Sequence, residues 1–193
     1  MSEETEKIKQ SEKILNAAYS CISSRGYANV SLREIADEAG VVLSQLNYYY
    51  KNKEGLFSEV ITIMIHKYLQ EVEKSLLVGE SAKEKILSLI RYFQKTLDES
   101  PELFRLLYDF TSMSLWSPHF GNLLRALFED LTNLIEKHAL NNLPSESNLR
   151  DYTPKAVARM LFGAMFGTAI QVILDPQEKK LPEALTTIEL VFN

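Results

Sequence analysis

The chain has 193 residues, of which 46% are hydrophobic and 24% charged, which is the balance of an ordinary soluble globular protein with a real hydrophobic core. Its acidic, polar N-terminus does not resemble a secretory signal, and no run approaches the roughly 18 consecutive apolar residues of a membrane span, so we expect a cytoplasmic protein. Cys21 is the single cysteine, which excludes an intramolecular disulfide and predicts a buried structural thiol.

The charge balance argues mildly against a nucleic-acid partner. The net charge is −5, and residues 1–55 carry seven basic and eight acidic side chains. Any affinity for DNA would therefore need a local basic face, with the acidic groups turned away from it.

Helical periodicity runs through the chain and strand-like alternation does not, so we predict an all-α fold of about nine helices. The first helix is expected over about Glu4 to Ser24, with Gly26 ending it. Ser31 caps a second helix, Glu34 completes a capping box, and Gly40 ends that helix.

The next predicted helix is short, about Leu43 to Tyr49, and Asn52 is placed to cap a long helix that runs to about Leu77. Beyond it we expect a helix ending near Leu97, helices opening at Pro101 and Pro118, a loop over residues 141–151, a helix from Pro154 to about Leu174 and a last helix opening at Pro182.

The segment Ser31–Phe57, which reads SLREIADEAGVVLSQLNYYYKNKEGLF, has the layout of a helix-turn-helix that lays its second helix in the major groove. Gly40 permits the positive backbone angle of a tight turn, and Ala36 is small where two helices must cross. The second helix is too short to be stable alone, and its amide and tyrosine side chains suit bases and phosphates. The alternative is a helical hairpin with a tyrosine-rich packing face.

The runs LREIADEAGV and LNYYYKNKEGLF resemble the TetR family of transcriptional repressors. The resemblance implies an N-terminal three-helix DNA-binding domain over residues 1–52 and a C-terminal helical domain over residues 53–193 that binds an effector and dimerises. It further implies a homodimer that binds a palindromic double-stranded DNA operator and is released by a hydrophobic small molecule, with no cofactor.

The same resemblance assigns roles to single residues. Ser31 would cap its helix and bond a phosphate, Tyr48 and Tyr49 would hold the DNA backbone, and Lys53 would meet a phosphate. Arg33 would either contact a phosphate or donate an ion pair within the domain, the ion pair being favoured. The residues implied to face base edges are Ser44, Gln45 and Asn47.

The segment also departs from the family pattern. Val42 and Leu43 stand where a serine and a basic residue are usual, Asn47 replaces a tyrosine, and Tyr50 replaces a phenylalanine. Without the usual serine, Ser44 becomes the candidate cap of the short helix. Val42 or Leu43 can instead touch a thymine methyl group, which would favour A·T pairs in the operator.

The long helix after Asn52 is apolar on more than one face, and Leu103–Trp116 is rich in aromatic residues and methionine, which suits an adaptable apolar pocket as well as a plain core. With the family resemblance, these features predict an inducer pocket for a fatty-acyl or aromatic compound, with an anionic end if Arg105 points inward. The candidate lining residues are Met64, Tyr68, Phe93, Phe104, Arg105, Tyr108, Met113, Trp116, His119 and Phe162. The three histidines lack metal-type spacing, so we predict no metal site.

Small residues mark the helix Lys155–Leu174 as the predicted dimer helix, because Gly163 and Gly167 let two backbones approach closely. The last helix would complete a two-fold interface, and the alternative is that both helices belong to the monomer core. The predicted interface residues are Val157, Leu161, Ala164, Met165, Thr168, Val172, Leu185 and Ile188.

No Gly-rich phosphate loop or G-x-S-x-G elbow occurs in the sequence, so we predict that the chain is not an enzyme. The function expected is that of a ligand-responsive transcriptional regulator, most simply a repressor. The alternative is a helical small-molecule-binding protein without operator binding, an alternative motivated by the acidic balance and by Val42 and Leu43.

Overall fold

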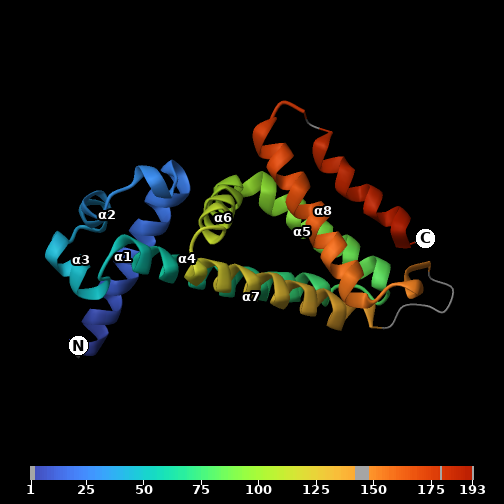
Figure 1. Ribbon diagram of the computed structural model, residues 1–193, viewed down its shortest axis with the longest axis horizontal. Helices are drawn as coiled ribbons and strands as arrows, with labels where there is room; N and C mark the ends of the chain where they lie inside the picture. Colours follow the sequence, from blue (N-terminus) through green and yellow to red (C-terminus); the bar gives the residue numbers. More distant parts are fainter. Residues whose placement is uncertain (1–2, 142–147, 179, 193) are drawn as a thin grey trace. The chain divides into compact units, whose positions relative to one another are not determined.

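The computed structural model describes residues 3–141, 148–178 and 180–192, and every regular element within these ranges is a helix (Figure 1). The all-α prediction is therefore confirmed. The chain divides into two compact units, Met1–Ile65 with Arg105–Gly121, and His66–Phe104 with Asn122–Asn193. These packing units differ from the predicted division after residue 52, which concerns function and stays a prediction.

The first unit is built on α1 (Glu3–Arg25), α2 (Leu32–Ala39), α3 (Leu43–Tyr49) and the start of α4 (Lys53–Leu76), with part of α6 (Pro101–Ser114). α1 packs against α2, and α2 packs against α3. The fully buried side chains of Ile14, Ile35, Leu46, Leu56 and Phe57 form its core. Cys21 is buried as predicted.

The helix ends in this unit follow the local sequence signals. The predicted third helix coincides with α3, and the predicted first helix differs from α1 by one residue at each end. The capping box of Ser31 and Glu34 is present, and Gly40 takes the left-handed conformation with φ +66° that ends α2. Asn52 caps α4, because its side-chain oxygen accepts the N–H of Gly55 at 2.8 Å.

The predicted cap of α3 was wrong. Val42, not Ser44, occupies the cap position, and no side chain caps the helix. The turn leaves no room for a later start, because the Val41 N–H bonds the Ala36 carbonyl while the Val42 carbonyl already accepts the N–H of Gln45 at 2.9 Å. Helix α3 therefore begins without the side-chain cap that supports α2.

The second unit contains the rest of α4 with α5 (Ala82–Glu99), α7 (Pro118–Ile135), a π-helical turn (Glu136–Leu140), a 3₁₀ turn (Asn148–Asp151), α8 (Pro154–Leu174) and a 3₁₀ helix labelled η4 (Leu181–Phe192). Of the predicted loop, residues 142–147 lie outside the described residues. The last helix is wound more tightly than an α-helix, and the hydroxyls of Thr186 and Thr187 each bond a carbonyl three residues earlier.

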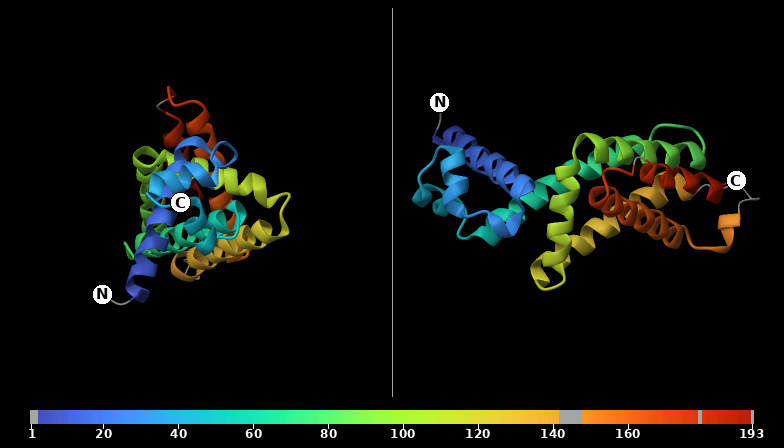
Figure 2. Two further views of the ribbon diagram at one scale, coloured as in Figure 1. Left: turned by 90° about the vertical axis from the view of Figure 1, so that its left-hand side faces the viewer. Right: turned by 90° about the horizontal axis from the view of Figure 1, so that it is seen from above.

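Helix α8 lies beside η4 in all three views (Figures 1 and 2), and the two are in contact. Val157, Leu161 and Met165 are buried, whereas Met160 and Leu174 are 50% and 77% exposed. By length and composition α8 could cross a membrane, with mean hydropathy 1.7 over an 18-residue window of which 28% is buried. Counting consecutive apolar residues missed this, because Arg159, two glycines, Thr168 and Gln171 interrupt the run. One face of α8 is therefore apolar and uncovered.

Candidate nucleic-acid interface

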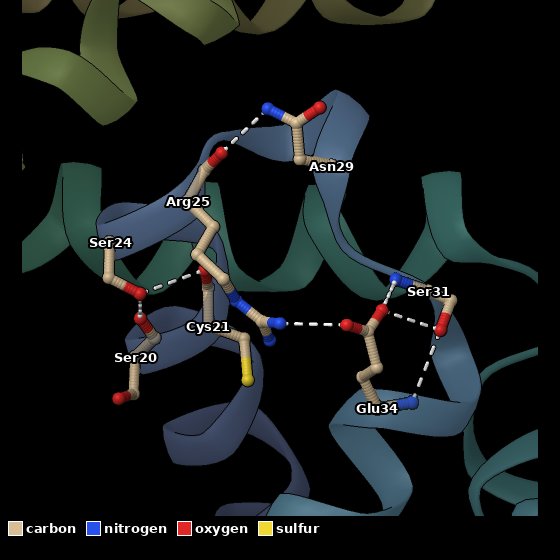
Figure 3. Close-up of polar contacts among 7 residues, drawn as sticks. All are labelled: Ser20, Cys21, Ser24, Arg25, Asn29, Ser31 and Glu34. Atoms are coloured by element: carbon tan, nitrogen blue, oxygen red, sulfur yellow. Dashed lines mark hydrogen bonds and ion pairs between the residues drawn. The ribbon is translucent and has the colours of Figure 1, made fainter.

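The start of α2 is tied to the end of α1 by one carboxylate (Figure 3). Glu34 accepts the backbone N–H and the hydroxyl of Ser31, both at 2.7 Å, and the Arg25 guanidinium, also at 2.7 Å. The bonds from Ser31, followed by that from Arg25, hold the pKa of Glu34 below its ordinary value. Glu34 thus stays ionised at neutral pH, and its charge is matched by Arg25.

Ser31 itself is committed on both sides. Its hydroxyl accepts the Glu34 N–H at 3.2 Å and donates its single hydrogen to the Glu34 carboxylate. The predicted capping role is confirmed, and the phosphate contact stays a prediction in which a phosphate oxygen competes with Glu34 for that hydrogen.

Helix α3 is anchored through Leu46, which is fully buried, while its other side chains turn outward to differing extents. The exposed residues of the predicted interface are Val42, Ser44, Asn47 and Tyr48, and the half-buried ones are Leu43, Gln45 and Tyr49. Tyr48 is 72% exposed, with its ring edge-on to that of Tyr49 at 5.3 Å between centroids. α3 therefore offers hydroxyl, amide and methyl groups on one short helix.

The ion pair of this region is formed by Arg25 and not by Arg33. Arg25 pairs with Glu34, whereas Arg33 is exposed and pairs with no carboxylate among the described residues. The ion pair favoured for Arg33 was wrong, because Glu34 already holds Arg25 at 2.7 Å. A free guanidinium at the start of α2 is consistent with the other alternative, a phosphate contact.

Lys53 is held inside the unit by Tyr27. Its ammonium group donates to the Tyr27 carbonyl and lies 4.1 Å from the centre of the Tyr27 ring, and burial lowers the pKa of Lys53. The Tyr27 N–H in turn donates to Asp109 of α6 at 2.8 Å. An ammonium has three hydrogens, so the predicted phosphate contact of Lys53 stays a prediction beside this structural role.

Two α1 residues that the sequence analysis did not single out contact α3. The Ser11 hydroxyl and the Tyr50 hydroxyl lie 2.8 Å apart, which gives the unusual tyrosine at this position a partner. Gln10 accepts hydrogen bonds from Gln45 and from the Tyr49 hydroxyl, the latter at 3.3 Å. No local signal marks Gln10, because its importance comes from a residue 35 positions away.

Residues 14–60 match the family model described as "Bacterial regulatory proteins, tetR family", which covers α1 from Ile14 through α2 and α3 to the start of α4. The chain carries the N-terminal DNA-binding domain of TetR-family transcriptional regulators. Its DNA-binding helix-turn-helix is the α2–α3 pair.

Relatives of similar length support this placement. The transcriptional regulator PksA of Bacillus subtilis is 24% identical over 172 residues, which are 87% of this chain and 80% of PksA. The nicotine-responsive transcriptional repressor HdnoR of Paenarthrobacter nicotinovorans is 23% identical over 175 residues, 88% of this chain and 86% of HdnoR. The structure of the fatty acid degradation regulator FadR from Bacillus halodurans has the same fold, with TM-score 0.76 and 15% identity over 95% of this chain and 94% of that one.

The effector residues expected of a TetR-like body differ widely in exposure. The buried candidates are Met64, Phe93 and Phe104, the half-buried ones are Tyr68, Tyr108, Met113 and Phe162, and the exposed ones are Arg105, Trp116 and His119. Trp116 is 87% exposed, and His119 bonds the Ser58 hydroxyl at 2.9 Å. The pocket stays a prediction.

Within the second unit, aromatic side chains do gather. Phe93 and Phe104 are edge-on at 5.0 Å, Phe162 contacts Phe128 at 5.0 Å, and Tyr68 lies 6.2 Å from Tyr92. Burial raises the pKa of both tyrosines above the ordinary value, at which a tyrosine hydroxyl is already neutral at physiological pH.

The residues predicted at the TetR-like dimer interface are also divided. Val157, Leu161, Met165, Leu185 and Ile188 are buried within the described subunit, Thr168 and Val172 are half-buried, and Ala164 is exposed. Because α8 is apolar all round, its sequence did not indicate which stripe faces its own core. The interface stays a prediction, and the uncovered stripe carries Met160, Gly163, Ala164, Gly167, Ile170 and Leu174.

Replacing the α2 cap separates stability from DNA binding. Ser31→Ala removes a capping side chain and is expected to lower the free energy of unfolding by about 1 kcal/mol. It should also weaken DNA binding, because the start of α2 loosens and the predicted phosphate contact is lost. Urea unfolding and fluorescence anisotropy with a labelled duplex measure the two effects.

Ser81→Ala is the matched control, because Ser81 forms the same capping box with Glu84 at the start of α5. It should cost a similar amount of stability and leave DNA affinity unchanged. Equal loss of affinity in both variants would reject a DNA-contacting role for Ser31.

Proposed function

We propose that this TetR-family regulator is a cytoplasmic, homodimeric repressor that binds a palindromic operator and is released by a hydrophobic small molecule. The observation that carries the DNA half is the arrangement of α3, in which the buried Leu46 fixes the helix while Gln45, Asn47 and Tyr48 remain available to a duplex. The name of HdnoR, a repressor, supports the sign of regulation.

The start of α3 supports an operator with A·T pairs. Val42 is 66% exposed at the cap position before α3, and it offers methyl groups where a serine would offer a hydroxyl. A thymine methyl group in the major groove is the matching base feature. Arg33 and the exposed Lys51 supply phosphate contacts beside it.

Selection from random duplexes at low salt should return a palindrome with A·T-rich half-sites about one or more helical turns apart. Arg33→Ala should weaken binding to the selected operator and to other duplexes by the same factor. It should also reduce the slope of log affinity against log salt concentration by about one, because one phosphate contact is lost. Arg91→Ala, which changes an exposed arginine of α5, is the control and should leave both unchanged.

G·C-rich half-sites would exclude the thymine contact. Absence of binding to any duplex at micromolar protein would instead favour the alternative function, a small-molecule-binding protein without an operator.

The uncovered stripe of α8 supports the dimer. An added Cβ at Gly163 or Gly167 would meet no atom within 4 Å, so a second backbone can approach there. The opposite face of α8 packs against η4 and α5 of the same unit. We infer that a second copy of the chain covers the stripe, by the two-fold contact common in homodimers.

Ile170→Glu should convert the dimer to monomers in sedimentation velocity and abolish cooperative operator binding, because a carboxylate would be buried against the partner's apolar stripe. Leu77→Glu introduces the same charge at a 63%-exposed apolar position at the end of α4 and should leave the dimer intact. A variant Ile170→Glu that still sediments as a dimer would place the interface elsewhere.

The aromatic second unit supports an apolar effector. Its neutral tyrosine hydroxyls can orient a ligand without requiring a charge on it. HdnoR is named as nicotine-responsive and FadR as a regulator of fatty acid degradation, so aromatic and fatty-acyl compounds are the two classes to examine. We propose that the effector shifts α4, whose first residues, Lys53 to Phe57, belong to the DNA-binding unit.

Titrating the operator complex with long-chain fatty-acyl compounds and with planar aromatic compounds should identify one class that releases DNA. A tenfold weakening requires that the effector bind the released state more tightly by roughly 1.4 kcal/mol. Tyr68→Phe, which removes the hydroxyl of a half-buried tyrosine, should reduce the response, while Tyr152→Phe at an exposed position should not.

If neither class changes operator affinity, the proposed effector is wrong. If Tyr68→Phe and Tyr152→Phe respond as the wild type does, Tyr68 does not orient the ligand.

A further inference from the structure

One side chain of α1, that of Gln10, forms hydrogen bonds with two side chains of α3. The Oε1 atom of Gln10 accepts the Nε2–H of Gln45 and the hydroxyl of Tyr49, which lies 3.3 Å away. Gln45 and Tyr49 are four residues apart and so share one face of α3. The three side chains line an open groove of about 460 Å³, together with Glu6, Lys7, Val42, Ser44 and Tyr48.

We propose that Gln10 is a positioning residue that makes Gln45 read adenine in preference to guanine. The inference rests on the proposed function, in that α3 must face bases in the major groove. It assigns to α1 a part in sequence choice beyond its support of the helix-turn-helix.

The chemistry follows from the groups that an amide carries. A glutamine side chain has two N–H donors and one carbonyl acceptor. Gln10 occupies one N–H of Gln45, which leaves Gln45 with one donor and one acceptor for a partner.

One donor and one acceptor are what adenine requires in the major groove, where it presents the N7 acceptor and the N6 amino donor. Guanine presents two acceptors, N7 and O6, and would need both N–H groups of Gln45. With one of them bonded to Gln10, Gln45 matches adenine and leaves a guanine acceptor without a donor.

The reverse orientation of Gln10 makes the opposite prediction. If the Gln10 amino group donated to the Gln45 carbonyl, Gln45 would keep both N–H donors and would suit guanine. Gln10→Glu distinguishes the two, because a carboxylate accepts and cannot donate, so it preserves the orientation of Gln45 seen in the structure.

The experiment measures the ratio of affinities for the selected operator and for duplexes in which single A·T pairs are replaced by G·C. The wild type should prefer adenine at one position of each half-site. Gln45→Ala should lower this preference by about 5- to 150-fold, the value of one bidentate base contact. Gln10→Ala should lower it by about two- to tenfold, the factor that corresponds to one hydrogen bond.

A conservative variant and a double variant distinguish a positioning role of Gln10 from a purely structural one. Gln10→Glu should keep the adenine preference while its charge weakens all duplexes alike. Gln10→Ala combined with Gln45→Ala should be no less selective than Gln45→Ala alone, because Gln10 acts only through Gln45. Asn16→Ala, which removes an exposed amide from α1, is the control and should leave the ratio unchanged.

A wild-type preference for guanine at this position, or a changed ratio in Gln10→Glu, would overturn the proposal. The proposal would also fail if Gln10→Ala kept the wild-type adenine preference while Gln45→Ala lost it. In that case, sequence-specific binding by the wild type would leave the proposed function intact. Binding with no sequence preference by the wild type would reject both.

Discussion

Helix α3 is too short to be stable in isolation, and its contacts with the rest of the first unit supply the missing stability. A helix of seven residues forms too few backbone hydrogen bonds to offset the free-energy cost of helix nucleation, and α3 also lacks a side-chain cap. Its stability comes from outside: Leu46 is buried in the core, and Tyr50 at its end bonds Ser11 of α1. The surface offered to DNA is therefore as well ordered as α1 is.

A second set of contacts meets at Tyr27, just beyond the end of α1. Gly26 there has φ +82°, and an added Cβ would lie 3.3 Å from the Asp109 carboxylate, so the chain turns in a conformation and a space that suit glycine. Tyr27 then bonds Asp109 of α6 and Lys53 of α4, while its ring packs 4.6 Å from that of Phe57. Displacement of either α4 or α6 would act on this residue, and through it on α1, which supports α3.

Local signals predicted the helices well because each depends on residues near in sequence. The capping box of Ser31, the left-handed Gly40 and the Asn52 cap are confirmed by contacts that span three or four positions. Long-range partners were not predictable in the same way. The sequence gives no reason to choose between Arg25 and Arg33 as the partner of Glu34, and only the packing of α1 against α2 brings Arg25 to it.

Burial on α8 was hidden for a related reason. A helix with apolar residues on all sides has no stripe to orient it. Val157 and Met160 therefore look alike until the packing of the second unit buries the first and leaves the second exposed. The bounds of α3 could be predicted, because a short polar segment after a glycine turn leaves few alternatives, while its contacts with DNA stay a prediction.

The net negative charge of the chain is consistent with the composition of α3. Val42 and Leu43, at the start of α3, carry no charge, and the cations Lys7, Arg33 and Lys51 lie on other segments. Few phosphate contacts give weak sequence-independent binding, because that binding comes from counterion release. Hydrogen bonds and methyl contacts to bases, in contrast, discriminate between sequences. If the proposed function holds, the uncharged start of α3 and the Gln45 amide held by Gln10 favour rapid release from non-specific DNA and an affinity that depends on the operator sequence.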